Sequence, residues 1–185
     1  MPEIREVLPF RQRAASYVLR QPPGGEVEVL VILHRDSPGA GVQVPGGGAL
    51  RHETIGEAAV REALEETGAG GLIFGEVLGS KLMRTSAVKE GYQVTTYSWL
   101  SSTETRDAWD HTVVSADEDD GLRMRCEFRQ VSGAGLNFGM DLFLLKAEER
   151  FAAVRLSARG RVPRPEDMSD HGLMRRDIGR ATMAA

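Results

Sequence analysis

Alternation of apolar and polar residues is clearest over residues 122–130, where apolar residues at every second position are separated by charged ones. A period of two is typical of a strand with one buried face. Apolar stretches rich in β-branched and aromatic residues predict further strands at 13–20, 26–34, 72–83 and 91–100. The turn sequence PPGG at 22–25 separates the first two of these strands.

Helical periodicity appears in two places. Thr54 followed by Glu57 three residues later forms a capping box, good helix formers follow, and Gly68 is a typical terminator, which predicts a helix over 55–67. Apolar residues at helical spacing predict a second, amphipathic helix over 140–154. Residues 36–41, 101–110 and 132–137 are predicted loops. The mixture of strands and helices predicts an α+β or α/β layered domain.

Length and composition predict that the chain forms one domain. The chain has 185 residues, of which 41% are apolar and 27% are charged, as in an ordinary globular protein. We predict a domain over 1–156 and a C-terminal extension over 157–185, because Gly160, Pro163 and Pro165 interrupt any regular pattern. Residues 167–183 form either a short helix or a tail in this interpretation.

Charge and cysteine content exclude several classes of protein. No apolar stretch is long enough to span a membrane, the N-terminus lacks a signal-peptide core, and Cys126 is the only cysteine, which together favour a cytoplasmic protein. A net charge of −4 and a pI of about 5.6 argue against a nucleic-acid binder, which needs a basic surface.

The predicted helix over 55–67 carries a cluster of acids. At about 100° per residue, Glu62, Glu65 and Glu66 lie within an arc of about 100°, with Val60, Ala63, Leu64 and Thr67 opposite as the buried face. Carboxylates so close repel one another, and a hard divalent cation such as Mg²⁺ or Mn²⁺ removes that cost. We therefore interpret the cluster as a metal platform. The alternative is the solvated face of a Glu-rich helix.

Two neighbours of the cluster support this interpretation. Arg61 can pair with Glu65 or Glu57, four residues away on either side, and so hold the ligands in place. The glycine triplet at 46–48 allows the preceding segment to pass close to the helix or to a ligand.

The stretch as a whole follows one spacing: Gly47, five residues, Glu53, seven residues, Arg61-Glu62-Ala63, one residue, Glu65-Glu66, one residue, Gly68-Ala69. This pattern resembles the Nudix box of the MutT-like Nudix hydrolase family, with alanine at the two positions that normally hold aliphatic residues. Seven fixed residues would match by chance at roughly 10⁻⁸ per starting position. The resemblance is specific over 47–69 and extends less specifically over about 13–154.

The resemblance implies both a fold and an activity. The fold is an α/β/α sandwich around a mixed β-sheet, and the activity is Mg²⁺- or Mn²⁺-dependent hydrolysis of a nucleoside diphosphate linked to another moiety. Glu62, Glu65 and Glu66 would be metal ligands, one of which also deprotonates or orients the attacking water. Glu53 and Arg61 would be the supporting ion pair, with Glu53 an alternative ligand. Bound cations would let an acidic protein act on an anionic substrate.

Residues outside the box carry weaker signals. The acids at 117–120 are interpreted as a solvated turn, and the alternative is a late-loop acid that completes the metal site, Glu118 or Asp119. Arg13 and Arg35 are candidates for contact with substrate phosphates. The remaining candidates are interpreted as packing or surface residues without a role in the site: Tyr97, Trp99, Trp109, Cys126, Arg123, Arg125, Arg129, His34, His52 and His111. The alternatives are that the aromatic residues stack on a base and that the three arginines bind phosphate.

Two other functions remain open at this stage. One is a non-catalytic Nudix-fold module that binds or senses a nucleotide, although such modules usually lose box glutamates that this chain retains. The other is a different reaction on the same scaffold, such as diphosphate isomerisation. The substrate could be a nucleoside triphosphate, a nucleotide sugar, ADP-ribose or a dinucleoside polyphosphate, and a homodimer is compatible with the family.

Overall fold

The computed structural model describes residues 10–85, 91–116 and 119–159. Eight strands form one sheet in the order β5-β6-β1-β2-β8-β7, with β3 added to β2 and β4 to β1. The longer strands are β1 (Phe10–Arg20), β2 (Glu28–His34), β5 (Ile73–Thr85), β6 (Gly91–Ser101) and β8 (Arg123–Gln130). The shorter ones are β3 (Val42–Gln43), β4 (Gly46–Gly48) and β7 (Ala108–Thr112). Because β1 runs parallel to β6 and the other pairs are antiparallel, the sheet is mixed.

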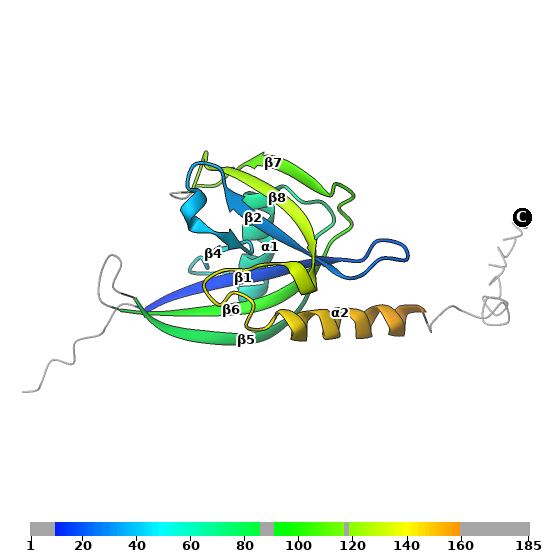
Figure 1. The fold of residues 1–185 in the computed structure, drawn as a ribbon. Coiled ribbons are helices and arrows are strands. Elements are labelled where there is room, and N and C mark those ends of the chain that lie inside the picture. The colour runs from blue at the N-terminus through cyan, green and yellow to red at the C-terminus, as the bar shows by residue number, and fades with distance from the viewer. Residues whose placement is uncertain (1–9, 86–90, 117–118, 160–185) are drawn as a thin grey trace, which may run out of the picture. The chain divides into compact units, whose positions relative to one another are not determined.

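Two apolar layers cover the two faces of this sheet. Alternate residues of β1 point to opposite faces, since Tyr17 belongs to one core cluster and Val18 to the other. The first cluster includes Leu144, Ala147 and Phe151 of helix α2 (Leu144–Arg159), and the second includes Ala63 of helix α1 (Ile55–Thr67). Helices therefore pack on both faces, as the α/β/α expectation requires (Figure 1).

The predicted strands and α1 are confirmed, with differences of a few residues at their ends. The loop predicted over 101–110 is wrong at its end, because Ala108–Asp110 begin β7 and pair with β8. The second helix begins at Leu144 rather than Met140, and Val154 is 55% exposed instead of buried. Single turns of 3₁₀ helix, η1 (Pro38–Ala40) and η2 (Val131–Gly133), lie within or beside predicted loops.

Strand β4 was not predicted, and it matters most for the site. β1 pairs with β2 only at Leu19 and Arg20, and farther toward its N-terminus it pairs with β4 instead, so that Ala14 lies opposite Gly47. This brings the glycine triplet beneath α1. Three glycines have low strand propensity, so only the neighbouring backbone of β1 gives them this conformation.

The chain divides into two units, residues 1–153 and 154–185, and the site described below belongs to the first. The predicted domain boundary at residue 156 stays a prediction. The extension is described only as far as residue 159, so its predicted helix or tail lies outside the described residues. No helix in the described part of the chain is long and apolar enough to cross a membrane.

Candidate active site

Helix α1 carries the predicted acids and begins and ends where the sequence places it. The backbone N–H of Glu57 donates to Thr54 Oγ1 at 3.2 Å, and the N–H of Thr54 donates to Glu57 Oε2 at 2.8 Å. Gly68 adopts the left-handed conformation at φ 58° and closes the helix. These two caps fix the bounds of the helix and so determine which side chains face the sheet.

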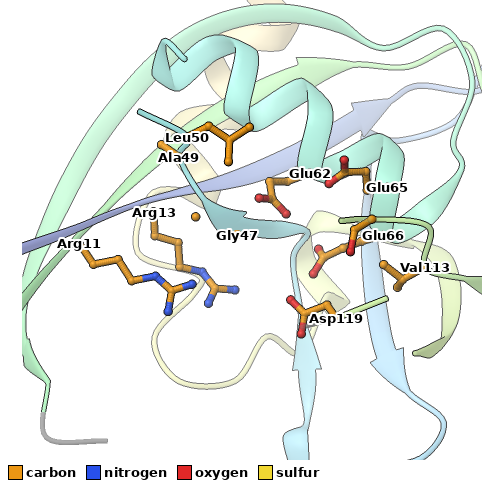
Figure 2. Close-up of a pocket in the computed structure, with 12 residues that line it drawn as sticks. Arg11, Arg13, Gly47, Ala49, Leu50, Glu62, Glu65, Glu66, Val113 and Asp119 are labelled. Carbon is orange, nitrogen blue, oxygen red and sulfur yellow. The ribbon is translucent and has the colours of Figure 1, made fainter. Parts of the chain in front are cut away.

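Three carboxylates of α1 converge on one pocket of about 550 Å³ (Figure 2). Glu62 and Glu66 are each only 6% exposed, and the Glu65 side chain is 24% exposed. The predicted division of α1 into an apolar buried face and an acidic outer face is therefore confirmed only in part, because Ala63 and Thr67 are buried as expected but Glu62 and Glu66 are buried as well. Leu64 is 54% exposed, whereas the acids turn toward the sheet.

The glycines of β4 explain how acids fit on the packed side of a helix. The N–H of Gly46 donates to Glu66 Oε2 at 2.8 Å. A Cβ atom at Gly47 would lie 2.2–2.4 Å from the carboxylate atoms of Glu62, far inside van der Waals contact. The predicted close approach of the glycine segment to the helix is thus confirmed, and at Gly47 only glycine leaves room for Glu62 in its observed position.

Arg61 connects most of the remaining acids of the stretch. Its guanidinium donates to both oxygens of Glu53 at 2.8 and 2.9 Å, and to one oxygen each of Glu62 and Glu65 at 2.9 Å. It also donates to the carbonyl of Gly48 at 2.9 Å. The expected Glu53–Arg61 pair and the Arg61–Glu65 pair are present. The alternative partner Glu57 is not used, because its carboxylate caps the helix.

Burial sets the electrostatics of the pocket. Desolvation raises the pKa of Glu66 to about 8, although the Gly46 hydrogen bond and the charge of Arg13 act in the opposite direction. Desolvation also raises the pKa of Glu62, against the opposing effect of Arg61. The hydrogen bonds from Arg61 lower the pKa of Glu53. Glu66 is therefore the acid of this cluster that most needs an additional positive charge.

The donor set suits a hard divalent cation, since it consists of carboxylate oxygens. Among the described residues, however, no three acidic, His or Cys side chains are arranged as a complete metal site. Arg61 draws Glu62 and Glu65 to itself, and Gly46 holds Glu66. Each of these hydrogen bonds uses one oxygen of its carboxylate, so the second oxygens of Glu62, Glu65 and Glu66 are left for a cation.

The opposite wall of the pocket comes from segments distant in sequence. Arg11 and Arg13 project from β1, whereas Asp119 lines the pocket on the side of Glu66 (Figure 2). The Arg13 side chain donates to the carbonyl of Gly46. Arg11 was missed by the sequence analysis, although it lies two residues from Arg13 on the same strand face, which is a signal that could have found it. Glu118, the other proposed late acid, lies outside the described residues.

The pattern of this site can be compared with known families. The family model of the NUDIX domain matches residues 10–135, which is more than half of the chain. The chain belongs to the Nudix family. It is accordingly a Nudix hydrolase, an enzyme that cleaves diphosphate bonds in small nucleotide-type compounds, and members of this family generally use divalent metal ions.

Solved structures confirm the Nudix fold. A binary complex of the Ap4A hydrolase from C. elegans has a TM-score of 0.51 at 15% identity, over 82% of this chain and 99% of that one. The Nudix hydrolase RenU from M. smegmatis has a TM-score of 0.51 at 20% identity, over 78% of this chain and 88% of that one. At these identities the likeness concerns the fold alone. No curated protein sequence matches the chain significantly.

Other candidates from the sequence lie away from the Nudix pocket. Arg35 pairs with Asp110 at 2.6 Å beside a separate hollow, so it does not join Arg13. The aromatic candidates and the cysteine are buried in the two core clusters, as expected for packing residues: Tyr97, Trp99, Trp109 and Cys126. His111, which received no role, lies with Nε2 2.9 Å from the carbonyl of Glu65 and so contacts the last turn of α1.

Proposed function

We propose that this Nudix hydrolase uses Mg²⁺ or Mn²⁺ to hydrolyse a phosphoanhydride bond in a nucleoside diphosphate linked to another moiety. The observation that carries the proposal is the convergence of Glu62, Glu65 and Glu66 on one pocket whose opposite wall is basic. Acids alone would repel the substrate, whereas acids that hold a cation would attract it. Activity on a soluble nucleotide-type substrate needs no membrane or nucleic-acid partner.

Each side chain has a distinct role in this proposal. Glu62, Glu65 and Glu66 would hold the divalent ion, which would neutralise phosphate charge and make water easier to deprotonate. Glu66 is our choice for the group that receives the proton of the attacking water, because it is the one acid of the three that does not pair with Arg61. Glu53 and Arg61 would keep Glu62 and Glu65 oriented. Asp119, which lines the same pocket, is the candidate for a further acid from outside the helix.

The first prediction concerns Glu66→Gln. This change keeps the side-chain volume but removes the charge that would hold the cation and accept the proton. We expect the rate to fall at least 100-fold on every substrate of a nucleotide panel assayed with Mg²⁺ and Mn²⁺. The matched control is Glu57→Gln on the same helix, where glutamine still completes the capping box and the pocket is untouched.

An unchanged rate in Glu66→Gln would remove the metal and proton-transfer assignments. Wild-type protein that binds nucleotides but hydrolyses none with either ion would instead favour the non-catalytic nucleotide-binding module. Circular dichroism of both variants should match the wild type, since neither substitution alters packing volume. A cytoplasmic location and a homodimer stay predictions.

A further inference from the structure

The basic wall of the pocket contains two arginines that lack acidic partners. Among the described residues, neither Arg11 nor Arg13 forms an ion pair, and Arg13 donates only to the carbonyl of Gly46. Most other described arginines are paired with acids: Arg20, Arg35, Arg61, Arg106, Arg123, Arg125, Arg129 and Arg150. Two adjacent unpaired cations at a pocket wall repel each other, so an anion bound there is favoured.

The side chains of Arg11 and Arg13 both reach the pocket because they lie two residues apart on strand β1. Residues two apart on β1 point to one face of the sheet, and both arginines line the pocket with Gly47 and Gly48. The Arg13 guanidinium donates to the Gly46 carbonyl, and the Arg11 guanidinium lies beside Gly48. In Figure 2 the two guanidinium groups stand across the pocket from the glutamates.

The charges of the pocket are therefore separated rather than mutually neutralised. Glu62, Glu65 and Glu66 lie on the helix side, and the charge of Arg13 acts on Glu62 and Glu66 without an ion pair to either. A substrate that spans the pocket would place one phosphate at the acidic side with its cation and another at the arginines. Guanidinium groups bind phosphate oxygens with strong, charge-assisted hydrogen bonds.

We propose that Arg11 and Arg13 bind a terminal phosphate, so that the enzyme prefers substrates with a free phosphate end. A terminal phosphate carries a charge of about −1.5 to −2 at neutral pH, whereas an internal phosphate that is substituted on both sides carries only one. Two guanidinium groups match the first better than the second. Nucleoside triphosphates are then favoured over nucleotide sugars and other diphosphates blocked at both ends. This inference rests on the proposed function for the chemistry at the glutamates.

The test compares a nucleoside triphosphate with a nucleoside diphosphate sugar of the same base, in Mg²⁺. In Arg11→Gln and in the double variant with Arg13→Gln, kcat/KM for the triphosphate should fall at least tenfold more than kcat/KM for the sugar compound, because each lost charge-assisted bond is worth about a factor of ten. The single variant Arg11→Gln is included as a guard against misfolding, since Arg11 forms no hydrogen bond or ion pair with the other residues that the structure describes. Arg51→Gln is the control, because Arg51 is exposed in a neighbouring groove.

A second measurement separates this inference from the proposed function. Calorimetry with a methylene-bridged triphosphate analogue, which cannot be hydrolysed, should show binding that weakens about tenfold in Arg11→Gln and remains unchanged in Arg51→Gln. Equal losses for both substrates, or a triphosphate affinity that does not depend on Arg11, would overturn the assignment. If wild-type protein hydrolyses no compound of the nucleotide panel, the proposed function fails, and the dependence of triphosphate binding on Arg11 still decides the role of the arginines.

Discussion

Glu66 is the residue whose environment departs furthest from that of a surface glutamate. It is 6% exposed, accepts one hydrogen bond from Gly46, and has no ion-pair partner among the described residues. Desolvation therefore outweighs the favourable contacts and raises its pKa to about 8. Helix propensity does not predict this raised pKa, because the pKa depends on how strand β4 covers the Glu66 side chain.

This raised pKa predicts how stability changes with pH when no divalent ion is present. The folded state keeps a proton on Glu66 that the unfolded chain, with its ordinary pKa of 4.5, has already lost. The contribution of Glu66 to the free energy of unfolding is therefore fully present below about pH 4.5. It decreases as the pH rises toward 8, by at most about 1.4 kcal/mol per pH unit. Thermal melts in EDTA should show the melting temperature falling over this range, and less steeply in Glu66→Gln.

Mg²⁺ should reverse the trend, because it competes with the proton for the same carboxylate. We expect the increase in melting temperature caused by Mg²⁺ to be larger at pH 8.5 than at pH 6. A wild-type protein and Glu66→Gln with the same pH slope in EDTA would show that Glu66 is not the group that titrates.

Strand β4 is the element on which the geometry of the site depends. Its glycines pair with β1 and lie close to α1, and two of them leave no room for a side chain. A Cβ atom at Gly46 would lie 2.3 Å from the backbone carbonyl oxygen of Ala14, whereas the three atoms nearest to a Cβ at Gly47 belong to the flexible end of Glu62. We therefore infer that Gly46 is required for stability and that Gly47 is required for the position of Glu62.

We predict opposite outcomes for alanine at these two positions. Gly47→Ala should fold, because the Glu62 carboxylate can move aside, but the displaced ligand should lower kcat at least tenfold. Gly46→Ala should lower the free energy of unfolding by about 1–3 kcal/mol, since the backbone of β1 cannot move aside as a side chain can. Melting temperatures and rates measured on both variants test the contrast.

Gly39→Ala serves as the control for these variants, because a Cβ atom at that position meets nothing within 4 Å. The assignment would be wrong if Gly47→Ala kept full activity, since Glu62 would then tolerate displacement. It would also be wrong if Gly46→Ala were as stable as Gly39→Ala.

Across the first unit, one buried cation joins segments that are distant in the sequence. Arg20 at the end of β1 donates to Glu28 of β2 at 2.7 Å, to Asp107, and to the carbonyls of Glu104 and Arg106. Its guanidinium also stacks over the ring of Phe128 in β8, 3.9 Å from the centroid. The Arg20 side chain is only 9% exposed, so its removal would leave Glu28 and the two carbonyls without their donor, whereas Asp107 is 90% exposed and can bind water instead.

Arg20→Gln should therefore lower the free energy of unfolding by about 2–4 kcal/mol, measured from urea denaturation. The control is Arg35→Gln, where the broken pair with Asp110 has side chains 49% and 63% exposed and contributes less than about 1 kcal/mol. Equal losses in the two variants would contradict a special role for the buried network. Neither residue lines the Nudix pocket, so activity of the folded fraction should persist.

Local signals in the sequence were sufficient for α1 and for most strands. The capping box, the terminating glycine and the period of the apolar residues all act within one or two turns, so they can be read without knowledge of the rest of the chain. The spacing of the Nudix box is equally local, and it identified the acids that meet in the pocket. Strands β3, β4 and β7 were not predicted, because their conformation depends on pairing with β2, β1 and β8.

The burial of the acids and the composition of the opposite wall depended on contacts between distant residues. Gly46 is 20 residues from Glu66, to which it donates, and 33 from Arg13, from which it accepts. Helical periodicity placed Leu64 inside and Glu66 outside, because it assumes that apolar groups alone are covered. In this protein a strand of glycines lies close enough to α1 to cover carboxylates instead. Covering removes water from them and raises their pKa, which is an effect that only the packed structure produces.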